Sequence, residues 1–204
     1  MTEATDRSAP AAQRPVVACY CATFLKPEML HIYRQITSLQ RVNPFVITQK
    51  REEAERFPFE RIAVVRKPAL RFARRFWYRQ VRTAPWQISK RETDSLIRIL
   101  EGARAELLHI YFGHIAVHLL PLICAWDRPS VVSFHGADVM VDLEKPNYRA
   151  AAKQMLEAVQ LVFARSESLA NALMEIGCSP EKIRIQRTGI PVDEILFRAR
   201  VWPN

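Results

Sequence analysis

Apolar and polar positions alternate along the chain in blocks that fit strands and helices in turn. Short apolar runs fit buried strands, and the segments between them carry apolar residues at helical spacing. Strands are expected at residues 16–21, 44–49, 61–66, 107–112, 130–135, 161–165 and 182–188. Helices are expected at residues 27–40, 70–84, 113–126, 147–160 and 166–177, among others. Continuous apolar strands between helices predict an α/β fold, with a doubly wound parallel sheet covered on both faces.

Three of the expected strands end in residues that can do chemistry. They are followed by residues 23–28, by Gly113 and His114, and by His135-Gly136-Ala137-Asp138. The chain contains neither a G-x-G-x-x-G nor a G-x-x-x-x-G-K-[ST] sequence, so the usual phosphate-binding loops are absent. In open parallel sheets, ligands bind beyond the carboxyl ends of the strands. The sequence therefore predicts a site at that edge, built without a glycine-rich loop.

Two segments resemble a known family. LLHIYFGHIAVHLLPLICAWDRPSVVSFHGADV resembles the family-four glycosyltransferases of GT-B fold, which often read H-x-H-F-G, then a helix, then a strand ending T-x-H-G-x-D. LVFARSESLANALMEIGCSPEKIRIQRTGIPVDEILF is similar to the family's approach to its inter-domain linker. The resemblance covers about residues Val16 to Phe197 and implies a Rossmann-like domain, the N-terminal half of a GT-B architecture.

The chain departs from the family pattern in three places. Tyr111 stands where the second histidine is usual, and residues 188–193 carry an extra residue without the usual asparagine. The first strand exit lacks the paired glycines of many members and is more similar to an S-E-T-F variant, in which Glu28 matches the glutamate.

The resemblance implies that His135 lies on the acceptor side of the cleft, near the reacting sugar. A neutral imidazole could accept a proton from the acceptor hydroxyl or orient it, at a distance of ~2.6 to 3.2 Å. The alternative is a histidine that only forms hydrogen bonds with the backbone at a strand exit. We interpret His135 as the catalytic residue.

The candidate substrate-binding residues share a position near a strand exit. They are Glu28, His114, Gly136, Asp138, Arg165 and Ser166. Most also have a structural explanation: the aspartate and the serine suit helix caps, and the glutamate suits the helix dipole. His114 could bind an anion at a helix start or simply pack.

The expected domain organisation is a flexible tail over residues 1–15, an acceptor-side domain over 16–197 and the start of a linker over 198–204. The resemblance implies that a second, donor-binding domain holds the nucleotide sugar, the co-substrate. It also implies retaining, metal-independent transfer to a lipid-linked or polysaccharide acceptor. No metal site or further cofactor is expected, and the isolated chain is expected to be inactive.

The net charge of +9 comes from one segment, because residues Arg61 to Arg91 hold ten basic residues and no acidic one. Within it, residues 70–84 predict an amphipathic basic helix, with Leu70, Ala73 and Trp77 on the apolar stripe. Basic residues beside aromatic ones suit an anionic membrane surface, and also nucleic-acid phosphates, the less favoured partner. The other option is a core-packing helix with a solvated basic face. The membrane-surface candidates are Arg71, Arg74, Arg75, Phe76, Trp77, Arg79 and Arg82.

The expected cellular location of the protein follows from its cysteines and its hydropathy. The spacing of Cys19, Cys21, Cys124 and Cys178 supports neither a disulfide framework nor a zinc site, so a reducing cytoplasm is expected. No apolar stretch approaches the roughly 20 residues of a membrane-spanning helix. Peripheral association with the inner face of the cytoplasmic membrane remains open. So does a different class of function, an inactive half-domain or binding module that acts through the basic segment.

Overall fold

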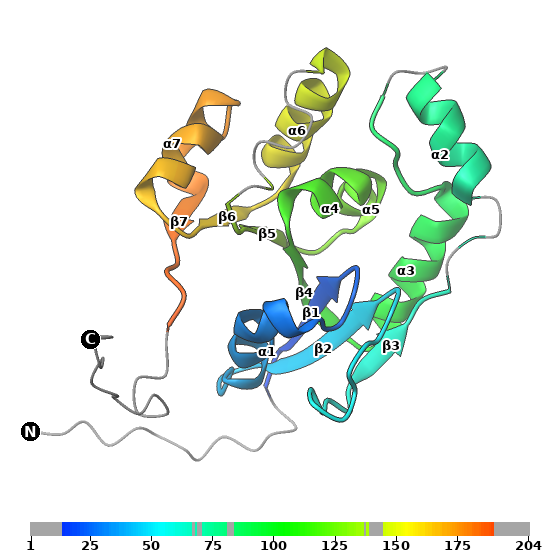
Figure 1. Cartoon of the computed structure of the whole chain (residues 1–204), viewed down its shortest axis with the longest axis vertical. Coiled ribbons are helices and arrows are strands. Elements are labelled where there is room, and N and C mark those ends of the chain that lie inside the picture. The colour runs from blue at the N-terminus through cyan, green and yellow to red at the C-terminus, as the bar shows by residue number, and fades with distance from the viewer. Residues whose placement is uncertain are drawn as a thin grey trace, which may run out of the picture.

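The computed structural model describes residues 14–66, 68, 71–80, 84–136, 138 and 145–189, without the side chains of residues 28, 71 and 79. Within these residues, seven parallel strands form one sheet in the order β3-β2-β1-β4-β5-β6-β7 (Figure 1). The strands are β1 (Val16–Cys21), β2 (Asn43–Thr48), β3 (Ile62–Val64), β4 (Ala105–Tyr111), β5 (Ser130–Phe134), β6 (Leu161–Ala164) and β7 (Ile183–Ile185). The predicted parallel α/β fold is confirmed, and the carboxyl ends of all seven strands meet at one edge.

Helices connect the strands in the predicted alternation. They are η2 (Pro27–Met29), α1 (Leu30–Thr37), α2 (Arg71–Gln80), α3 (Lys90–Gly102), α4 (Gly113–His118), α5 (Leu120–Ala125), α6 (Pro146–Ala158), α7 (Glu167–Glu175) and η4 (Pro180–Lys182). The predicted helix over 113–126 is wrong in one respect, because it breaks into α4 and α5 at Leu119. Pro121 has no backbone N–H to continue the helical hydrogen bonds, and its ring clashes with the carbonyl four residues earlier.

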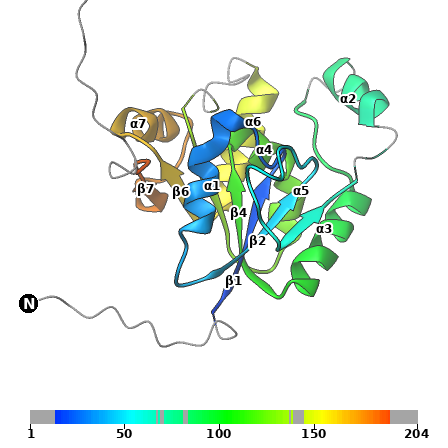
Figure 2. The same cartoon turned by 60° about the horizontal axis from the view of Figure 1, so that its bottom comes forward.

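The two faces of the sheet contact different helices, because successive side chains of a strand point to opposite faces. On one face, Cys19 and Cys21 pack with Ile32 of α1. On the other face, Tyr20 and Ile110 belong to a larger core that includes residues of α3 to α7. Figure 2 shows α1 on its side of the sheet, with α4, α5 and α6 on the other. Helix α1 is thus the cover of one face near the centre of the sheet.

The carboxylate of Asp138 joins the ends of β4 and β5. Its Oδ2 accepts a hydrogen bond from the Gly113 amide at 2.9 Å, and its Oδ1 accepts one from the His135 amide at 2.8 Å. The side chain is only 8% exposed, and a charged acceptor strengthens both bonds. Gly136, between the strand end and Asp138, has a φ of +128°, a conformation that favours glycine.

Gly113 lies against a ring of the core. A Cβ at this position would be 1.9 Å from Cε1 of Phe134, which is 3% exposed and cannot move into solvent. The start of α4 therefore approaches the end of β5 too closely for any residue with a side chain.

Helix α2 lies at the margin of the molecule in both views (Figures 1 and 2). The side chains of Ala73 and Trp77, on the predicted apolar stripe, are exposed, so this stripe is not packed into the core. Arg74 faces α3 instead: its guanidinium pairs with Glu92 and donates to the Gln87 carbonyl at 3.0 Å. Polar contacts of a basic residue thus attach α2, and its aromatic side chains face outward.

We expect Gly113→Ala to lower the free energy of unfolding by about 1–3 kcal/mol, the usual cost of overpacking a core. Gly102→Ala is the matched control, since a Cβ there meets nothing within 4 Å at the end of a helix. It should leave stability unchanged or raise it by up to about 1 kcal/mol. Urea denaturation followed by circular dichroism measures both, and equal midpoints for Gly113→Ala and the wild type would contradict the close approach.

Asp138→Ala should also destabilise the fold, by about 1–3 kcal/mol, because two amides lose their acceptor. Asp138→Asn keeps one acceptor oxygen and should lose less. Asp127→Ala, at an exposed position, should have little effect. The same denaturation experiment tests the order of the variants; a wild-type midpoint for Asp138→Ala would show that the carboxylate does not hold the two strand ends together.

Candidate functional site

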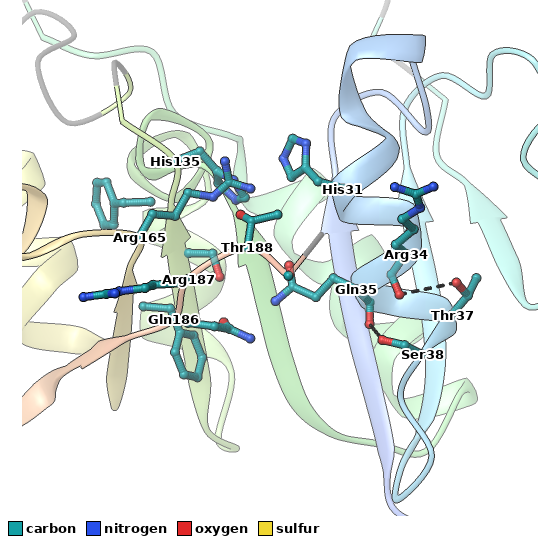
Figure 3. A pocket seen from close by; sticks show the side chains of 14 residues that line it. His31, Arg34, Gln35, Thr37, Ser38, His135, Arg165, Gln186, Arg187 and Thr188 are labelled. Atoms are coloured by element: carbon teal, nitrogen blue, oxygen red, sulfur yellow. Dashed lines mark hydrogen bonds between the residues drawn. The ribbon is translucent and has the colours of Figure 1, made fainter. Parts of the chain in front are cut away.

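A pocket of about 570 Å³ lies between α1 and the carboxyl ends of β5, β6 and β7 (Figure 3). Its volume is typical of small-molecule sites, and it lies at the predicted edge of the sheet. The lining residues come from α1 and from the three strand ends. They are His31, Arg34, Gln35, Thr37, Ser38, Ser133, Phe134, His135, Phe163, Arg165, Gln186, Arg187, Thr188 and Gly189.

Strand alternation explains why β5 and β6 supply polar side chains here. In β5, Val132 belongs to the core beneath the helices, while Ser133 faces the other way and lines the pocket. In β6, Ala164 belongs to that core, while Phe163 and Arg165 line the pocket. The pocket is therefore on the same face of the sheet as α1.

Helix α1 presents two kinds of surface. Ile32 and Ile36, four residues apart, are fully buried against the sheet, where each contributes about 1.5–3 kcal/mol. His31, Arg34 and Gln35 recur at spacings of three and four beside them and line the pocket. Burial of the isoleucine stripe thus aims the neighbouring polar stripe at the strand ends.

The His135 imidazole lies among other rings, with its centroid 4.6 Å from that of Phe112 and 5.3 Å from that of His31. Neither ring nitrogen has a hydrogen-bond partner within the described part of the chain. Burial, followed by the nearby Arg165, His31 and His109, lowers the pKa of His135 to about 3. A neutral imidazole offers one donor and one acceptor. The hydrogen bond of this residue to Asp138 uses its backbone amide, so both ring nitrogens remain for a ligand.

A second histidine, His109, contacts Ser133, one of the residues that line the pocket. His109 Nε2 lies 2.6 Å from Ser133 Oγ, and its ring stacks on Tyr111 with centroids 4.3 Å apart. Burial lowers the pKa of His109 to about 4, so it too is neutral at physiological pH. Tyr111, in the place of a family histidine, therefore fills the core with an aromatic ring.

The structure brings two of the predicted site residues together in the pocket and places others elsewhere. His135 and Arg165 come together in the pocket, and Figure 3 shows the Arg165 side chain extending toward His135. Asp138 joins the ends of β4 and β5 by accepting hydrogen bonds from backbone amides just beyond them. His114 and Ser166 are not among the lining residues that the structure describes.

Three of the predicted substrate-binding residues have other positions or roles. Ser166 is the N-cap of α7, with Oγ accepting from the Leu169 amide at 3.2 Å. His114 is exposed at the surface, and partial desolvation lowers its pKa while the charge of Asp138 partly restores it. The backbone of Glu28 belongs to η2, and its side chain lies outside the described residues.

Two groups of lining residues were missed by sequence reasoning. His31 and Arg34 could have been found from their spacing beside the buried isoleucines. The exit of β7, Gln186 to Gly189, follows a strand that the sequence predicts, but only the sheet order brings it opposite α1.

The charge of the pocket has one sign. Arg34, Arg165 and Arg187 line it together with two histidines, and none of its described lining residues is acidic. No group of three or more histidine, cysteine or acidic residues in the described part of the chain could hold a metal ion. The site can therefore bind an anion and can hold a hydroxyl group against a neutral imidazole.

Solved structures with a similar fold include two that are described with UDP or UDP-glucose. Alr3699/HepE from Anabaena in complex with UDP-glucose has a TM-score of 0.60 and 13% identity, over 87% of this chain and 45% of that one. MnaA from S. aureus with UDP has a TM-score of 0.58 and 10% identity, over 85% of this chain and 44% of that one. UDP-N-acetylglucosamine 2-epimerase from Rickettsia bellii has a TM-score of 0.55 and 10% identity, over 84% and 44%.

At these identities the likeness shows the fold alone, and the chain spans less than half the length of each of these proteins. No curated protein matches the sequence. The family profile described as Glycosyltransferase Family 4 matches residues 30–194, from the start of α1 to beyond β7. The chain has the N-terminal Rossmann-like domain of the GT-B fold and belongs to glycosyltransferase family 4.

Proposed function

We propose that this chain is the acceptor-side domain of a retaining glycosyltransferase, which moves a sugar from a nucleotide sugar to a polysaccharide or lipid-linked acceptor. The observation that carries the proposal is His135, a neutral imidazole with both ring nitrogens unpartnered among the described residues, at the strand ends of a family-four domain. In the transfer, the bond from the sugar to the nucleotide breaks, a bond from the sugar to the acceptor oxygen forms, and the proton of the acceptor hydroxyl passes to the phosphate of the departing nucleotide.

The donor is proposed to bind mainly to a second domain. Proteins of similar fold are described with UDP or UDP-glucose bound, and this chain covers only 44–45% of them. A nucleotide-sugar co-substrate held largely elsewhere fits a pocket that contains no glycine-rich phosphate loop. On this proposal the isolated chain turns over no nucleotide sugar, because one half cannot position both reactants.

His135 is proposed to orient the acceptor hydroxyl by a hydrogen bond. General bases work best when their pKa lies near the operating pH. The pKa of His135, lowered to about 3 by burial and nearby positive charge, makes the imidazole a weak proton acceptor. Its hydrogen-bonding atoms are nevertheless well suited to hold a hydroxyl in one orientation.

We also propose that α2 rests on an anionic membrane surface at the cytoplasmic side. Phe72, Phe76 and Trp77 are 69%, 66% and 44% exposed, and Arg75 is exposed beside them. Aromatic rings settle at the headgroup level, and each basic residue contributes about 1 kcal/mol near anionic lipid. Arg74 is left out of this surface because it pairs with Glu92.

Three further members of the predicted membrane surface are not described. The side chains of Arg71 and Arg79, and the whole of Arg82, lie outside the described residues. The described helices include none that is long and apolar enough to cross a membrane.

In the enzyme completed with a donor-binding domain, His135→Ala should lower kcat/KM about 10²-fold, since a misplaced acceptor costs about that much. His135→Gln should retain more activity, because its amide still offers a donor and an acceptor. Arg98→Gln, at an exposed position on α3, is the control. Transfer of labelled sugar from a panel of nucleotide sugars measures the effect. Full activity in a folded His135→Ala enzyme would contradict the role.

The pH profile separates orientation from proton transfer. The folded pKa of about 3 keeps the imidazole neutral down to low pH, so an orienting His135 should add no acidic limb to kcat/KM between about pH 8 and 5. A limb near pH 6 that disappears in His135→Gln would show instead that this residue takes the proton.

Vesicle flotation tests the membrane surface. The chain should bind vesicles that contain phosphatidylserine and bind neutral vesicles weakly, and salt should reduce binding by screening the charges. Arg75→Glu and Trp77→Ser should each weaken binding several-fold, while the control Arg98→Glu should not. Equal binding to neutral and anionic vesicles, or unchanged binding of the α2 variants, would contradict the proposal.

A further inference from the structure

The pocket between α1 and the ends of β5 to β7 has a charge that a neutral sugar does not require. Its described lining holds three arginines and no carboxylate. Like charges gathered around a partly enclosed space repel one another, and a bound anion relieves that repulsion. The arrangement therefore stabilises an anion more than an uncharged ligand.

Arg165 is the central cation of this pocket. It is half-buried at the end of β6, and its guanidinium makes no hydrogen bond or ion pair within the described part of the chain. Asp138 is the nearby acidic group that influences it. Both oxygens of that carboxylate already accept backbone amides, from Gly113 and His135. The five N–H donors of Arg165 thus remain for a ligand.

Groups on the opposite wall complete the site. Figure 3 shows His31 and Gln35 of α1 extending toward the side that carries Arg165 and His135, with Thr188 between the two walls. Arginine matches the geometry of phosphate oxygens with two parallel N–H bonds. The hydroxyl of Thr188 and the neutral imidazole of His135 add further donors. With about 570 Å³, the space holds a phosphate together with the sugar attached to it.

We infer that this pocket binds a sugar phosphate, with the phosphate held by Arg165 and the sugar beside His135. The inference rests on the proposed function and assigns the phosphate to the acceptor: the enzyme extends a sugar that carries a phosphate ester. A lipid-linked sugar and a soluble sugar phosphate share this chemistry.

Isothermal titration of the 204-residue chain tests the site without any transfer reaction. The probes are a hexose 1-phosphate, its neutral methyl hexoside and UDP. The hexose 1-phosphate should bind, more weakly at high salt, and the methyl hexoside should bind at least tenfold more weakly. Arg165→Gln should weaken phosphate binding about tenfold or more, the loss expected for a charged hydrogen bond. Arg98→Gln should leave it unchanged.

An NMR titration of the histidine ring protons adds a readout of position. A phosphate bound beside Arg165 offsets its positive charge, so the pKa of His135 should rise on binding. Arg165→Lys keeps the charge but loses the planar pair of donors, and should bind more weakly than the wild type while folding normally. Circular dichroism of each variant confirms the fold.

Three outcomes would overturn the inference: equal binding of the methyl hexoside, unchanged phosphate binding in Arg165→Gln, or a His135 pKa that does not respond. UDP that binds more tightly than the hexose 1-phosphate, with the same losses in the variants, would assign the site to the donor and reject the acceptor role. A phosphate site that behaves as expected in an enzyme that transfers no sugar would reject the proposed function while upholding the site.

A soluble and a membrane-bound source of the phosphate are then distinguished. Undecaprenyl-linked and soluble sugar phosphates are offered to the completed enzyme in the presence of anionic vesicles. Preference for the lipid-linked form that is lost in Trp77→Ser supports a membrane source, and equal use of both supports a soluble one. Failure to use either would overturn the acceptor assignment.

Discussion

The carboxylate of Asp138 is the contact on which the site depends. By accepting the amides of Gly113 and His135, it joins the ends of two neighbouring parallel strands, beside the hydrogen bond from the Phe112 amide to the Ser133 carbonyl at 2.9 Å. Because the backbone of His135 is held, its imidazole can lie against Phe112 and His31 with both ring nitrogens left over. The close packing of Gly113 on Phe134 supports the same junction from the core side.

The two faces of the sheet differ in character: one packs into the hydrophobic core, and the other lines the pocket. On the face covered by α3 to α7, the central strands contribute apolar side chains to one large core. On the other face, α1 covers the centre, and β5 and β6 offer Ser133, Phe163 and Arg165 to a pocket. Period-two alternation alone produces both surfaces from the same strands. The stability of the domain and the polarity of its site are therefore carried by alternate residues.

Burial and charge act together in the pocket. Removal from water lowers the pKa of His135 and His109, and the nearby guanidinium of Arg165 lowers that of His135 further. The imidazoles are thereby kept neutral, so the arginines are the cations that a ligand meets. Neutral hydrogen-bonding groups beside fixed positive charge suit the hydroxyl of a sugar next to an anionic substituent.

The sequence by itself determined the strand and helix order, the parallel sheet and the edge at which the site lies, because these follow from local periodicity; its strand-exit motif also singled out His135 as the candidate catalytic residue. Only the tertiary structure decided which side chains meet there. Arg34 and Thr188 are more than 150 residues apart, and only the sheet order brings them to one pocket. The tertiary structure also decided that Asp138 accepts hydrogen bonds from two backbone amides and that Arg74 faces α3. A side chain's partner depends on packing between elements, which the local sequence pattern does not encode.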